Sequence, residues 1–148
     1  MRRRKNNRFN NIANKHPFII HGVTEIYDDN PLIAGWVNYH THGLSDHGLT
    51  ELSIVCPDIN DTRPCELINI VGDMMLNGET FEFGCVHCLD DDNGITIHKF
   101  MLKPTTCFEE TSIRIIIPDK DTNMFIKESP YNLQNLDVFT DYENISLS

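Results

Sequence analysis

The hydrophobic positions in the first third of the chain follow the short periods that are typical of β-strands. Two apolar runs, "PFIIHGV" (17–23) and "LIAGWVNYHT" (32–41), are rich in β-branched and aromatic residues. The segment "ELSIVC" (51–56) alternates Leu52, Ile54 and Cys56 with Glu51, Ser53 and Val55. We therefore expect three strands before residue 57.

The period then changes to that of a helix. In "DTRPCELINIVGDMMLNG" (61–78), apolar residues recur at i, i+3, i+4 and i+7, namely Leu67, Ile70, Val71 and Met74. Asp61 or Thr62 can cap the start of this helix, Pro64 suits its first turn, and Gly78 can end it. The pattern predicts a helix over about 63–77 whose apolar stripe packs in the core.

Strand patterns return after the helix. "TFEFGCVHC" (80–88) and "ITIHKFML" (95–102) are joined by the acidic "DDDNG", in which Asn93-Gly94 can supply the positive φ values of a tight hairpin turn. The apolar run over 113–117 indicates a strand that is buried on both faces, at the centre of the sheet. These elements predict a single compact α+β domain, a mixed, mostly antiparallel sheet with the one main helix packed on it.

Charge divides the chain unevenly. Residues 1–15 hold six of the twelve Lys and Arg residues and no acid, whereas the remainder holds all 22 Asp and Glu residues. We expect 1–15 to be a basic flexible arm, 16–140 to be the domain and 141–148 to be a loose tail. The acidic body disfavours nucleic acid, except through the arm, and suits a basic protein partner.

The composition of the chain argues against a membrane-spanning or secreted protein. No apolar run approaches the roughly twenty residues that a membrane span needs, and no apolar stretch follows the basic N-terminus as it does in a signal peptide. The five cysteines are scattered through apolar stretches, as reduced core thiols are. We therefore expect a cytoplasmic protein with no membrane partner; the oligomeric state stays open.

Histidines are concentrated in "YHTHGLSDHGL" (39–49). His40 and His42 are two residues apart, so in a strand their imidazoles lie on one face. Gly43 lets the chain turn, after which Asp46 or His47 can supply a third ligand of an open zinc or iron site. His21, His87 and His98 could complete the site only if the fold brings them near. The alternative is that these histidines form hydrogen bonds within a polar turn or line a cleft without a metal.

Other motifs are less specific. Cys85 and Cys88 have the spacing of a zinc knuckle, but the sequence contains no second such pair. A cysteine nucleophile assisted by histidine is conceivable, although no nucleophile signature singles one out. The glycine-rich loops that bind nucleotide phosphates are absent from the sequence. Catalytic residues therefore stay unassigned.

The order of several short blocks resembles a known family. "NYHTHGLSDHGLTELSIVC", then "LNGETFEFG", "IRIIIPDKDTN" and "SPYNLQ" are similar to the domain-of-unknown-function 4262 family of small bacterial and phage proteins, over about residues 35–135. The recurrent positions of the family correspond to Thr41, His42, Gly43, Leu44, Glu51, Leu52, Gly78, Phe81, Gly84, Arg114, Pro118, Asp119 and Gln134. Thr50 stands where a Pro is common. The resemblance implies one compact domain and no particular activity.

Arg114 is a charge within an apolar strand. Such a guanidinium should reach the edge of the sheet or pair with a carboxylate, and Asp46, Glu51 and Asp119 are the candidates. We expect these residues to share a cleft with the histidine turn. Two functions stay open: a metal-binding or metal-dependent protein that uses His40, His42, His47 and Asp46, or a non-enzymatic inhibitor or regulator whose acidic surface binds a basic partner.

Overall fold

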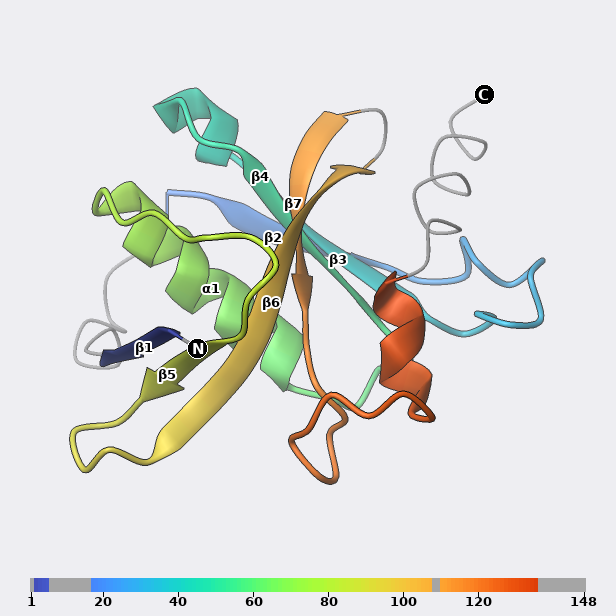
Figure 1. Cartoon of the computed structure of the whole chain (residues 1–148). Helices are drawn as coiled ribbons and strands as arrows, with labels where there is room; N and C mark the ends of the chain where they lie inside the picture. The colour runs from blue at the N-terminus through green and yellow to red at the C-terminus, as the bar shows by residue number, and fades with distance from the viewer. Residues whose placement is uncertain (1, 6–16, 108–109, 136–148) are drawn as a thin grey trace.

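The computed structural model describes residues 2–5, 17–107 and 110–135, which form a twisted sheet, one α-helix and two short 3-10 helices (Figure 1). The strands are β1 (Arg2–Lys5), β2 (Ile19–Val23), β3 (Val37–His42), β4 (Glu51–Cys56), β5 (His87–Asp90), β6 (Thr96–Cys107) and β7 (Glu110–Ile116). The helices are α1 (Arg63–Leu76), η2 (Leu44–His47) and η3 (Pro130–Asn135).

The sheet is mixed but mostly antiparallel. Within the described residues its strand order is β1-β5-β6-β7-β4-β3-β2. Among the strand pairs that the structure describes, only β1/β5 and β4/β7 are parallel. β7 lies between β6 and β4, so the apolar run over 113–117 is central, as its sequence predicts. The α+β class with one main helix is confirmed.

Helix α1 begins and ends close to the predicted residues. Thr62 is the N-cap residue, and Pro64 lies in the first turn, where a missing N–H breaks no hydrogen bond. Asp61 accepts a hydrogen bond from the Arg63 backbone N–H at 3.1 Å. Asn77 is the C-cap residue, and Gly78 adopts a φ of 90°, the left-handed conformation that ends many helices.

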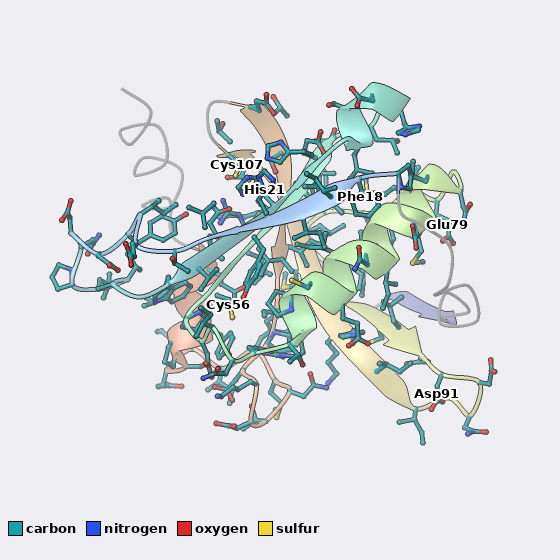
Figure 2. The ribbon with its side chains drawn as sticks, turned by 180° about the vertical axis from the view of Figure 1, so that it is seen from behind. Phe18, His21, Cys56, Glu79, Asp91 and Cys107 are labelled. Carbon is teal, nitrogen blue, oxygen red and sulfur yellow. The ribbon has the colours of Figure 1, made fainter. Side chains whose placement is uncertain are left out.

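The main core lies between α1 and one face of the sheet. The apolar stripe of α1 is buried with residues of β4, β6 and β7 that point toward the helix, among them Leu52, Leu102 and Ile115. Phe18, which precedes β2, also reaches α1, and Figure 2 shows it at the helix. A Cβ added at Gly72 of α1 would lie 2.5 Å from Cζ of Phe18, so the absent side chain makes room for this ring.

Two predicted strands are shorter than their apolar runs. In the run 32–41, β3 begins only at Val37, because successive turns and Gly35, with a φ of 81°, interrupt the extended chain before it. In 80–88, β5 begins only at His87, and Gly84 has a φ of 78°. Apolar residues in both turn segments are nevertheless used in packing, so their hydrophobicity alone does not indicate a strand.

The β5–β6 turn also differs from its prediction. The N–H of Gly94 donates to the carbonyl of Asp91 at 3.0 Å, and the Asp91 side chain accepts from the N–H groups of Asn93 and Ile95. Gly94 has a positive φ of 79°, whereas Asn93 is not among the residues with positive φ. A turn stabilised by an aspartate side chain therefore replaces the expected pair of left-handed residues.

The N-terminal arm belongs in part to the sheet. Arg2–Lys5 forms strand β1, which pairs with β5 and places Arg2 opposite His87. The rest of the predicted arm, over 6–15, and the predicted tail over 141–148 lie outside the described residues, so the domain boundaries stay predictions. No helix in the described parts of the chain has the length and apolar character that a membrane span requires.

Candidate metal centre

A row of polar residues crosses the sheet on the face opposite α1. Strand register places His21 of β2 opposite His40 of β3, His40 opposite Ser53 of β4, Ser53 opposite Arg114 of β7, and Arg114 opposite Lys103 of β6. Directly paired residues point to the same face of a sheet. The row therefore gathers groups from five strands that are far apart in the sequence.

Three histidines meet at one end of this row. His21, His40 and His42 each offer a nitrogen, and these atoms all lie within 4.8 Å of one another. The ring centroids of His40 and His42 are 4.9 Å apart, and those of His21 and His42 are 4.4 Å apart. The expectation that His40 and His42 share one face is confirmed, and His21 joins them from the neighbouring strand.

Exposure differs within this histidine cluster. His40 is buried, with 7% of its surface exposed, whereas His21 and His42 are exposed. The sheet thus fixes one imidazole and leaves two at the surface, and Figure 2 labels His21 on its strand beside the end of the sheet that carries Cys107. An ion could reach the cluster from solvent without any movement of the backbone.

The surroundings of His40 keep its imidazole neutral. Burial lowers the pKa of His40 to about 4, and the neighbouring His42 and His21 and the Arg114 guanidinium act in the same direction. Glu51 opposes this effect only in part. Because a metal binds the neutral form of imidazole, His40 is ready to coordinate one at neutral pH.

A pocket of about 340 Å³ lies beside the cluster. Its lining includes His40 and His42, together with residues from the ends of β2, β4, β6 and β7, namely Val23, Glu51, Cys107, Glu110, Thr111 and Ser112. Most of these side chains are small, and none is lysine or arginine. A small molecule in this pocket would lie next to any ion that the histidines hold.

Glu51 has a structural task next to this pocket. Its carboxylate accepts hydrogen bonds from the Thr41 hydroxyl at 2.7 Å and from the backbone N–H groups of Gly43, Leu44 and Ser45 at 3.1–3.3 Å. Burial alone would raise the pKa of Glu51, but these hydrogen bonds lower it below its usual value. Glu51 therefore holds the chain at the point where it turns after His42.

Asp46 and His47, the predicted third ligands, lie elsewhere. Both belong to η2, both are exposed, and neither is part of the cluster formed by His21, His40 and His42. The hydrogen bonds to Glu51 wind residues 43–45 into the start of η2, so the chain does not fold back over His40. His21 supplies the third imidazole instead.

The predicted cleft is assembled only in part. Arg114 is buried, with 1% exposed, and lies in central strand β7 on the row that contains His40. Asp119 accepts hydrogen bonds from the Ser129 hydroxyl and from the N–H groups of Asp121 and Thr122. Glu51 lines the pocket, and its carboxylate accepts hydrogen bonds from Thr41 and the η2 backbone; the pairing of Arg114 with a carboxylate stays a prediction.

The remaining histidines and paired cysteines lie away from the cluster. His98 contacts Glu66 of α1 at 3.1 Å, and His87 stacks on Phe100. Cys85 is partly exposed and lies 3.7 Å from Nε2 of His87, whereas Cys88 is buried. Within the described residues, Cys85 and Cys88 do not form a metal-ligating group with a third side chain.

Sequence reasoning named His21 without selecting it. The sequence feature that points to His21 is its position in an apolar strand segment. If the segments 17–23 and 32–41 pair as neighbouring strands, His21 can lie beside His40 on the same face of the sheet. The sequence does not determine this strand register, because only short hairpin loops restrict the register and the connection over 24–36 is long.

Comparison of the chain with family models, with curated proteins and with solved structures gives no match. The resemblance to the domain-of-unknown-function 4262 family therefore stays a prediction from short motifs.

Proposed function

We propose that the protein binds a divalent transition metal through His21, His40 and His42 and uses it on a small molecule held in the adjacent pocket. The observation that carries this proposal is the meeting of three imidazole nitrogens within 4.8 Å, one of them buried and neutral at pH 7. Three neutral imidazoles are the ligand set of an open catalytic zinc site.

The ligand set favours zinc over iron. Open iron sites commonly use two histidines and one carboxylate, and the carboxylate of Glu51, which lines the adjacent pocket, is held by the Thr41 hydroxyl and three backbone N–H groups. In tetrahedral zinc sites the ligand nitrogens are about 3.3 Å apart, so the exposed His21 and His42 rings would move by about 1 Å to close the site.

The pocket supports a site with an open coordination position. Three protein ligands leave room for water or for a substrate atom, and both His40 and His42 line the pocket. Bound zinc lowers the pKa of a coordinated water to about 7 and so supplies a nucleophile at neutral pH. The chain itself contributes the orientation of the histidines and a pocket whose described lining includes no lysine or arginine.

Metal binding is tested on untagged protein. Purified protein is stripped with a chelator and titrated with Co²⁺ and Zn²⁺, while visible absorption reports the coordination geometry of cobalt. We expect one ion per chain and a tetrahedral cobalt spectrum. Metal analysis of the protein as purified tests whether zinc or iron is the resident ion.

Two variants make this test specific. His42→Ala removes a cluster ligand and should weaken zinc binding by at least tenfold, whereas His47→Ala removes an exposed imidazole of η2 and should leave it unchanged. Equal affinities of the two variants, or the absence of one-to-one binding in the unmodified protein, would refute the proposal. The alternative function, binding of a basic protein partner, rests on the net charge of −10 alone and stays a prediction.

A further inference from the structure

We propose that Asn38 is a positioning residue of this centre, which holds the proton of His40 on Nδ1 and thereby makes Nε2 the metal ligand. This inference rests on the proposed metal function. It assigns a task to a buried amide that lies two residues before His40 on the same face of β3. It also connects the centre to the smaller core on this side of the sheet.

The contact between the two side chains is direct. Nδ1 of His40 lies 2.9 Å from Oδ1 of Asn38, and Asn38 is fully buried. An amide oxygen can only accept, so this hydrogen bond requires a proton on Nδ1. A neutral imidazole has a single ring proton, which leaves the lone pair on Nε2, the nitrogen at the far side of the ring.

The nitrogen of the Asn38 amide has contacts of its own, on the side away from His40. Its Nδ2 donates to the hydroxyl of Tyr27 at 2.9 Å and lies 3.8 Å from Sγ of Cys107. Tyr27 is fully buried in a second hydrophobic cluster with Ile33, Trp36 and Val55. The segment over 24–36, which joins the two histidine strands, thus anchors a chain of hydrogen bonds that ends on His40.

This arrangement matches the supporting shell of metal sites. A histidine ligand commonly donates its second ring N–H to an oxygen, which fixes the ring and its tautomer, and loss of that oxygen costs about 10–100-fold in metal affinity. The reverse orientation of the Asn38 amide would place Nδ2 against Nδ1 and move the proton to Nε2. The two orientations therefore predict opposite tautomers of His40 and can be distinguished by spectroscopy.

The first measurement uses the metal-free protein. Long-range ¹H–¹⁵N correlation at pH 7 reports which ring nitrogen of each histidine carries the proton, and His40→Gln identifies the His40 signals. We expect His40 to be the Nδ1–H tautomer. Observation of the Nε2–H tautomer would overturn the inference, whatever the protein does with metals.

The second measurement is the affinity for zinc alone. Asn38→Leu, of similar volume, should weaken zinc binding by about 10–100-fold, and Asn38→Asp, which keeps an acceptor oxygen, should retain it. Tyr27→Phe keeps the buried ring and removes only the hydroxyl; we expect a smaller loss and a mixture of His40 tautomers. Because this variant preserves packing, it keeps the test valid if Asn38→Leu does not fold.

The outcomes separate this inference from the proposed function. If unmodified protein binds no zinc but His40 is the Nδ1–H tautomer, the metal function fails while the tautomer assignment stands. If zinc binds and Asn38→Leu and Tyr27→Phe both keep the affinity of the unmodified protein, Asn38 has no positioning role. Loss of affinity in Asn38→Leu together with rescue in Asn38→Asp supports it.

Discussion

The two faces of the sheet differ in the kind of residues that they bury. The face toward α1 is apolar, with Leu52, Leu102 and Ile115 buried against the helix. The opposite face has the polar row from His21 to Lys103, and there burial is accompanied by hydrogen bonds and charge. Neighbouring residues of a single strand thus belong to different environments, which means that a substitution can be directed at one face at a time.

Arg114 and Ile115 test this contrast most directly, because they are consecutive in β7 and point to opposite faces. Arg114→Ala should lower the free energy of unfolding by about 3 kcal/mol or more, since it leaves the polar groups around a buried guanidinium desolvated. Ile115→Ala should cost about 2–5 kcal/mol by leaving a cavity. Chemical denaturation measures both.

Arg114→Met separates the charge of Arg114 from its volume. A methionine fills much of the same space without a guanidinium, so the loss should persist if charge is what the polar face requires. A change below about 0.5 kcal/mol for Arg114→Ala, the range of ordinary surface substitutions, would contradict the contrast between the faces.

The pH dependence of stability should arise in part from His40. Its pKa is about 6.5 when unfolded and about 4 when folded, so below pH 6.5 the unfolded chain takes up a proton that the folded protein does not. Stability of the metal-free protein should therefore fall by about 3 kcal/mol between pH 6.5 and pH 4 and level off below pH 4 for this group. His40→Gln should show a correspondingly smaller slope over this range; an identical slope would refute the assignment.

Gly72 tests the apolar face. Alanine is the better helix former by about 1 kcal/mol, but its Cβ would lie 2.5 Å from the buried Phe18 ring. We expect Gly72→Ala to lower the free energy of unfolding by about 1–2 kcal/mol through overpacking. The penalty should shrink in a Phe18→Leu background. A stabilising Gly72→Ala would show that the Phe18 ring moves aside at little cost.

Glu51 should give the smallest of these effects. Glu51→Gln keeps one acceptor oxygen for the η2 backbone and removes the charge, so we expect a loss of about 1 kcal/mol, measured by thermal unfolding. Asp46→Asn, an exposed change in the same 3-10 helix, is the control and should stay within about 0.5 kcal/mol. Equal effects of the two changes would argue against a special role of Glu51.

Secondary structure is predicted best from the sequence where one hydrophobic period continues without interruption and residues typical of element ends flank it. Strand β4 matches the alternation over 51–56, and α1 matches the helical stripe between Pro64 and Gly78. The segments 32–36 and 80–86 are apolar yet contain left-handed glycines, whose conformation depends on the surrounding turns. Hydrophobicity predicts burial there but not the extended backbone.

The candidate site was predictable to a similar degree. His40 and His42 share a face because spacing along a strand is local information. The third imidazole of the cluster belongs to His21 and not to His47 for two reasons that involve residues far apart in the sequence. These are the register of β2 on β3 and the hydrogen bonds from the η2 backbone to Glu51. Neither follows from the spacing of histidines in "YHTHGLSDHGL".

The pairing of His21 with His40 has a consequence for how the chain finds its fold. Shifting β2 by one residue along β3 would turn every β2 side chain to the other face and bring Ile20 or Gly22 opposite His40. Such a misaligned hairpin would retain many backbone hydrogen bonds but only two of the three imidazoles. An ion that needs all three imidazoles would therefore bind the correctly aligned hairpin more tightly than the misaligned one. Its binding would favour the correct register, which the long connection over 24–36 does not specify.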